Sequence, residues 1–238
     1  MKGFPRIFRT GVGSCLGAWV AIALAPGGPA AAEERRSAYS QTVDLAVGVG
    51  PSKATGVVSW NHFRGFGKSE RLKAGFGLRL ASLFGGQDLA YATADAELIG
   101  QNKINTLKVS DARTHSLNLE FQIKYRFLRK VEAGFDIDLI GVGFGPARTG
   151  EYVSGSPGFS GRQRAEVSSF DLLQGGKPDR GQLDSEFFLA YWWSERWAIR
   201  AGYSHFRSEY TTTRPLDFAN DRYRHERNLG LIAVTLRP

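Results

Sequence analysis

The side chains best suited to catalysis lie in two short segments near the C-terminus. The segment GYSHFRSEY contains His205 and Ser208, and the segment RHERN contains Glu226. A serine hydrolase needs a histidine within hydrogen-bond reach of the serine hydroxyl, and an acid that orients the histidine. His205 and Ser208 are three residues apart, so on an ideal strand they point to opposite faces. The spacing therefore favours a solvated strand end, and leaves this trio as an alternative candidate for hydrolysis.

Acidic side chains form a second group with chemical potential. Asp136 and Asp138 are two residues apart, which places both carboxylates on one face of a strand, and Glu120 is expected on the adjacent strand. No histidine joins them, whereas Lys124 and Arg126 are expected on the same face. We interpret the group as paired charges and predict neither a metal site nor a cofactor.

These residues belong to segments with a strict two-residue period. The stretch SLNLEFQIKYRF, residues 116–127, alternates apolar and polar side chains without a break, as β-strands do. Three connections, 84–114, 145–182 and 211–223, are long, and they alternate with short ones. The connection 145–182 is rich in Gly, Ser and Pro, which predicts a mobile surface loop. The predicted strands run near 41–50, 55–64, 71–83, 115–127, 131–144, 183–193, 197–210 and 224–237.

The two faces of these strands differ in a way that predicts which one is inside. One face is apolar, while the other carries charges together with glycines such as Gly75, Gly134 and Gly202. Glycine gains nothing on an exposed outer face, but inside a narrow barrel it leaves room for a long neighbour. The charged face is therefore predicted to be the interior, and its near-equal numbers of acids and bases predict a plugged one. The predicted interior network is Lys73, Arg79, Glu120, Lys124, Arg126, Glu132, Asp136, Asp138, Glu186 and Arg200, with Asp44 on the same face.

Aromatic residues gather near the three short turns. Such a cluster is typical of the girdle that marks a membrane surface. The predicted girdle is Trp60, Tyr125, Phe127, Trp192, Trp193 and Trp197.

The N-terminus is typical of an export signal. Basic residues precede an apolar run from 12 to 25, and small residues up to Ala32 follow, so we predict a signal peptide over 1–32, cleaved near Ala32, and one domain over 33–238. The chain has 31 basic and 23 acidic residues, a net charge of +8. Its charges alternate with apolar residues instead of forming a basic stripe, which argues against nucleic acid as a partner.

The signal peptide, the eight alternating strands and the closing GLIAVTLRP resemble the small outer-membrane β-barrel proteins of Gram-negative bacteria. The resemblance implies an all-β, eight-stranded antiparallel up-and-down transmembrane β-barrel in the outer membrane. It also implies contact with outer-membrane lipid and lipopolysaccharide, and leaves room for a surface partner at the long loops. One departure is Pro238, because such chains commonly end in an aromatic residue.

The expected function is non-enzymatic, in a structural or surface-interaction role. Two alternatives stay open. A soluble periplasmic, lipocalin-like barrel would turn the apolar face inward around an apolar ligand. A lipid A-modifying hydrolase would use His205, Ser208 and Glu226, although the lipid A deacylase pattern has His and Ser two residues apart.

Overall fold

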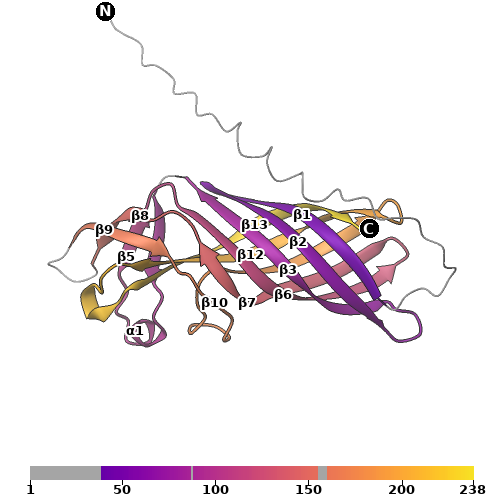
Figure 1. Cartoon of the computed structure of the whole chain (residues 1–238), viewed down its shortest axis with the longest axis horizontal. Coiled ribbons are helices and arrows are strands. Elements are labelled where there is room, and N and C mark those ends of the chain that lie inside the picture. Colours follow the sequence, from indigo (N-terminus) through magenta and orange to yellow (C-terminus); the bar gives the residue numbers. More distant parts are fainter. Residues whose placement is uncertain (1–38, 87, 155–159) are drawn as a thin grey trace, which may run out of the picture. The chain divides into compact units, whose positions relative to one another are not determined.

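The computed structural model describes residues 39–86, 88–154 and 160–238. The predicted signal peptide over 1–32 lies outside the described residues. The described chain is almost entirely β-structure, in a single antiparallel sheet of thirteen strands (Figure 1). Within these ranges, no helix is long and apolar enough to cross a membrane.

Eight long strands pair in a closed circle, which we call the eight-strand ring. Each strand pairs antiparallel with the next, and the last pairs back with the first, so the ring has no free edge. All eight strands that the alternation predicted are present. They are β1 (Tyr39–Gly50), β2 (Lys53–Phe66), β3 (Leu72–Gly85), β6 (Arg113–Leu128), β7 (Val131–Phe144), β11 (Leu183–Trp192), β12 (Trp197–Thr212) and β13 (Arg222–Leu236).

A second closed circle, the six-strand ring, continues from one end of the first. It consists of four further strands together with β12 and β13. The four further strands are β4 (Leu89–Thr93), β5 (Thr106–Val109), β8 (Arg148–Val153) and β9 (Ser160–Val167). The pairing runs β12–β9–β8–β5–β4–β13 and returns to β12. The hairpin of β12 and β13 extends beyond its neighbours and is shared by both rings (Figure 1).

The long connections are therefore not loops throughout. The prediction of a mobile loop over 145–182 was wrong in this respect, because that segment contains β8, β9 and β10 (Asp171–Leu172), and β10 pairs with β7. The connection 84–114 contains β4, β5 and the short helix α1 (Ala96–Gly100), and the last one contains a 3₁₀ turn, η2 (Asp217–Ala219). These strands are stabilised by pairing with distant partners, which local patterning does not report.

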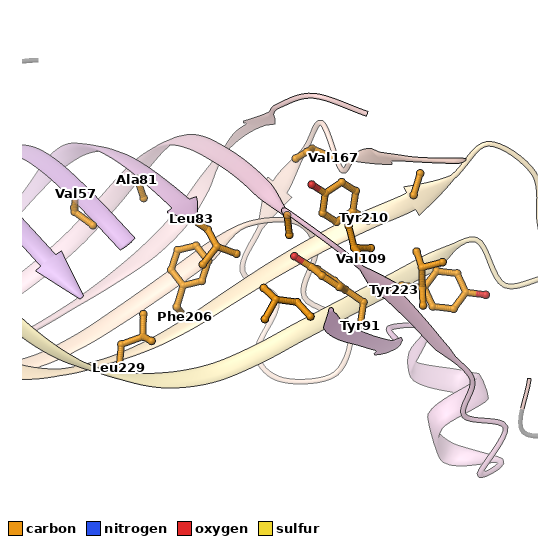
Figure 2. Packing of buried hydrophobic residues seen from close by; sticks show 14 of the residues in the cluster. Val57, Ala81, Leu83, Tyr91, Val109, Val167, Phe206, Tyr210, Tyr223 and Leu229 are labelled. Atoms are coloured by element: carbon orange, nitrogen blue, oxygen red, sulfur yellow. The ribbon is translucent and has the colours of Figure 1, made fainter. Parts of the chain in front are cut away.

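The apolar core lies in the six-strand ring. Every one of its strands points at least one apolar side chain inward, and the rings of Tyr91 and Tyr210 meet edge to face at 5.2 Å between centroids (Figure 2). Leu83, Phe206 and Leu229 continue the core into the adjoining end of the eight-strand ring. The inward side chains of the six-strand ring include Leu89, Tyr91, Leu107, Val109, Tyr152, Ala165, Val167, Tyr210 and Tyr223.

We expect Leu107→Ala to loosen the six-strand ring and leave the eight-strand ring folded. Leu107 is fully buried, and truncation at such a site costs about 2–5 kcal/mol. Trypsin should then cut the variant within 145–182 faster than wild type. The difference in gel mobility between boiled and unboiled protein, which reports the closed eight-strand ring, should persist. Val153→Ala, an exposed position on β8, is the matched control. Equal cleavage of the Leu107 variant and wild type would contradict this core.

Candidate functional site

The outer surface of the eight-strand ring is apolar. Along β6, Leu117, Leu119 and Ile123 are exposed, while Asn118, Glu120 and Gln122 are buried. Each of the eight strands presents at least two large exposed apolar side chains. They include Leu45 and Val47, Trp60 and Phe66, Phe76 and Leu78, Leu117 and Leu119, Ile140 and Val142, Phe187 and Leu189, Ile199 and Tyr203, and Ile232 and Val234.

Arg79 lies at the centre of the interior and is 1% exposed. Its guanidinium is 2.7 Å from the Glu120 carboxylate, 2.5 Å from Asp136 and 3.0 Å from Asp138. Glu186 is a fourth carboxylate at 3.8 Å. All four partners were predicted to be interior, and the fold brings them around one cation from strands β6, β7 and β11.

Arg200 forms the second centre of the same network. It lies 3.1 Å from Asp44, 2.8 Å from Glu186 and 3.3 Å from Asp136, so the two arginines share carboxylates. Its guanidinium also lies over the ring of Phe188, 3.6 Å from the centroid. A Cβ atom at Gly134 would collide with the ring of Phe188, and one at Gly202 would collide with the backbone of Phe187 and Phe188. Gly134 therefore makes room for the aromatic ring beneath the cation, and Gly202 allows the close approach of β11.

Amide side chains connect the network, and sequence reasoning missed them. Asn61 donates to Asp44 at 3.1 Å, Asn118 donates to Asp138 at 2.9 Å, and Gln122 donates to Asp136 at 3.0 Å. A further buried acid, Asp184, accepts from Ser204 at 2.5 Å. Asn118 and Gln122 alternate with outward apolar residues along β6, so the same two-residue period that identified the charges could have found them.

The end near the short turns has a looser set of contacts. Arg126 pairs in register with Glu132, and its Nε lies 3.0 Å from the carboxylate. Lys124 lies over the ring of Phe63 at 4.2 Å. Lys73 donates to the Ser40 hydroxyl at 3.3 Å, apart from the central network. The predicted interior residues thus divide into a central cluster around two arginines and a group close to the turns.

Most of the predicted aromatic girdle is exposed at the same end. Tyr125, Phe127, Trp193 and Trp197 are between 41% and 48% exposed, whereas Trp60, 48% exposed, lies in the middle of β2 opposite Leu78. Trp192 is a correction, because it is 7% exposed and points inward, where Arg237 lies over its ring at 4.1 Å. The reason is the strand period itself: with Tyr191 and Trp193 facing outward, the residue between them must face inward.

The structure does not assemble the candidate hydrolase trio. His205 contacts Asn228 at 2.8 Å, and Glu226 pairs with Arg207 at 2.8 Å. Ser208 is completely buried and lies 3.1 Å from the Tyr91 hydroxyl. The described residues also contain no group of three His, Cys, Asp or Glu side chains that could hold a metal ion.

Polar contacts at the junction of the two rings hold the segment that leads into β11. Asp171 accepts the N–H of Gln182 at 2.7 Å, and burial raises the pKa of its carboxyl to about 8. Burial alone would also raise the pKa of the Asp179 carboxyl. The N–H of Gln174 and the Arg207 guanidinium outweigh this effect, so the pKa of Asp179 is lowered. The segment is therefore held by hydrogen bonds from its own backbone and by an ion pair between Asp179 and Arg207 of β12.

Comparisons with known proteins find distant similarity at the level of solved structures. No protein-family model matches the sequence, and no curated protein sequence matches it. Neisserial surface protein A is 8% identical with a TM-score of 0.38, covering 85% of this chain and 98% of that one. The Yersinia pestis outer membrane protein Ail is 10% identical with a TM-score of 0.38, covering 84% of this chain and 99% of that one. The Pseudomonas putida toluene transporter TodX is 9% identical with a TM-score of 0.23, covering 84% and 67%. Similarity this distant assigns no function.

We expect Arg79→Met to destabilise the protein severely. The variant leaves Glu120, Asp136 and Asp138 close together without their shared cation, and breaking a buried pair in this way costs about 3–5 kcal/mol. The urea midpoint of the folded form, followed by gel mobility without boiling, should fall sharply. Arg126→Gln removes a partly exposed pair and should cost about 0–1 kcal/mol. Equal midpoints for the two variants would show that Arg79 does not organise the interior.

Proposed function

We propose that the chain spans the outer membrane of a Gram-negative bacterium as an eight-stranded antiparallel up-and-down β-barrel, and serves a non-enzymatic structural or surface-interaction role. The observation that carries the proposal is the inverted distribution of side chains. Large apolar residues cover the outside of the eight-strand ring, while Arg79, Arg200 and their carboxylates are buried inside it.

The inverted distribution fits lipid as the surrounding solvent. Exposed apolar patches on water-soluble monomers rarely exceed a few hundred Å², whereas here every strand of the ring is apolar outside. In lipid, each backbone N–H and C=O group needs an internal partner, and a closed ring of strands supplies these partners. Both requirements of a membrane span are met by the same element.

Two features of the interior support a plugged barrel over a pore. An eight-stranded barrel encloses only enough space for its own side chains, and here those side chains are buried and mutually paired. Between the charged network and the six-strand ring, Leu83, Phe206 and Leu229 form part of an apolar core that continues into the six-strand ring (Figure 2).

The six-strand ring is the part suited to contacts outside the membrane. Outer-membrane barrels place short turns in the periplasm and long connections outside the cell, and the long connections of this chain build the six-strand ring. Its exposed cations, such as Lys108 and Arg162, are suited to lipopolysaccharide phosphates. Lipopolysaccharide and a surface partner are therefore the contacts we propose for this end.

The two alternative functions receive less support from the side chains. A lipocalin-like binder needs an apolar cavity, whereas the centre of the eight-strand ring holds the paired charges around Arg79 and Arg200 and the amides that hydrogen-bond to them. A hydrolase needs an accessible serine, whereas Ser208 is buried against Tyr91. The first observation favours the proposed membrane span over a soluble binder, and the second favours a non-enzymatic role over a hydrolase that uses Ser208.

Replacing Leu119 with Arg tests the proposed membrane span. Leu119 is an outward residue near the middle of β6, and an arginine facing lipid at that depth costs about 2–4 kcal/mol. We expect the variant to be depleted from washed outer membranes relative to wild type. Thr149→Arg places the same charge on the outside of the six-strand ring and should insert normally. A Leu119 variant that inserts as well as the Thr149 variant would rule out lipid contact at this face.

A further inference from the structure

Exposed positive charge is concentrated at the end of the eight-strand ring that carries the short turns. We call six exposed residues there the basic rim: Arg64, Lys68, Arg71, Arg129, Lys130 and Arg196. Glu195 is the one exposed acid among the described residues of this end, since Glu70 is half-buried. The rim therefore has a large local excess of positive charge.

The rest of the described surface has no such excess. There, eight exposed basic side chains stand against six exposed acidic ones. Several are neighbours of opposite sign: Arg164 lies 3.2 Å from Glu166, and Arg162 pairs in register with Glu151. The basic rim is thus a local feature and does not reflect a uniformly basic chain.

Among the described residues, the rim cations have no acidic partner of their own. None of the six lies within ion-pair distance of a carboxylate of the described chain. Arg64 instead lies over the exposed ring of Tyr39, 6.0 Å from its centroid. Unpaired guanidinium and ammonium groups at a surface are suited to phosphate, which arginine binds through two parallel hydrogen bonds.

The neighbours of the rim indicate where that phosphate lies. Trp193 and Trp197 are exposed and stack on each other at 6.4 Å, on either side of Arg196 in the chain. Tyr125 and Phe127 are exposed just before Arg129. Aromatic rings of this kind sit at headgroup level, and long basic side chains beside them reach toward the lipid phosphates.

We infer that the basic rim binds the headgroups of anionic phospholipids in the leaflet that the short turns face. This inference rests on the proposed membrane span, and names a lipid class for one end of it. Charge complementarity selects the occupant: a cationic ring at headgroup depth, beside a lipid-facing apolar wall, meets anionic headgroups before any other anion. An acidic protein or polymer is the competing occupant, and would leave no preference among lipids.

The tryptophans of the chain offer a direct readout. Trp192, Trp193 and Trp197 lie beside the short turn between β11 and β12, so Trp19→Phe combined with Trp60→Phe gives a full chain whose fluorescence reports this end alone. The protein is folded into phosphatidylcholine vesicles that contain phosphatidylglycerol, with bromine on one lipid or the other at equal mole fraction. Insertion is verified in each preparation by the gel shift between boiled and unboiled samples.

We expect brominated phosphatidylglycerol to quench more strongly, with a relative affinity about two- to fivefold in its favour, and the preference to shrink in high salt. A rim variant carrying Arg71→Gln, Arg129→Gln, Lys130→Gln and Arg196→Gln should lose the preference. The matched control, with Lys108→Gln, Lys177→Gln, Arg180→Gln and Arg227→Gln, removes the same number of exposed cations elsewhere and should keep it.

The outcomes separate the two proposals. Insertion with equal quenching by the two lipids overturns the lipid inference alone, as does a preference that survives in the rim variant. Failure to insert into either vesicle overturns the proposed membrane span, and the lipid inference with it.

Discussion

Arg79 and Arg200 impose the constraint on which the rest of the structure depends. A charge enclosed in a narrow, closed sheet must be paired and hydrogen-bonded, because its desolvation is otherwise too costly. The structure meets this constraint by surrounding Arg79 with four carboxylates and letting Arg200 share two of them. The central inward positions are thereby committed to charged and hydrogen-bonding side chains, and large apolar residues cover the outside. The apolar outer wall is the consequence, and a membrane is the solvent that suits it.

The shared hairpin of β12 and β13 joins two interiors of opposite character. In the eight-strand ring it contributes Arg200 and Ser204 to the polar network, and in the six-strand ring it contributes Tyr210 and Tyr223 to the apolar core. On the proposed membrane span, the change follows from what surrounds each ring. A ring in lipid has no need of an apolar core, because its outer face already avoids water, whereas a ring in water needs one to be stable.

Sequence patterning predicted the eight-strand ring well because its strands are long. An uninterrupted alternation such as 116–127 defines the strand, its inward face and hence the residues around Arg79. Arg126 and Glu132, both members of the predicted interior network, lie in register across the short turn between β6 and β7. The prediction that Trp192 belongs to the exposed girdle was wrong. It relied on the gathering of aromatic residues near the turns, whereas the two-residue strand period turns Trp192 inward.

The six-strand ring could not be predicted in the same way. β4 and β5 have five and four residues, too few for alternation to stand out from chance. β8 and β9 lie in a Gly-rich and charged segment that is typical of loops, and they become strands by pairing with β5 and β12, which are distant in sequence. Non-local pairing of this kind is specified by the whole fold, so single-segment propensity does not reveal it.

The most direct test of which face meets lipid is a nitroxide scan of β6. The sequence has one cysteine, Cys15, so Cys15→Ser gives a background for single cysteines at Leu117, Leu119 and Ile123. In reconstituted vesicles, the account predicts that labels at these outward positions collide often with oxygen, which concentrates in lipid, and rarely with a water-soluble nickel chelate. Frequent collision with the chelate at these positions would show that the apolar face meets water, and would contradict the membrane span.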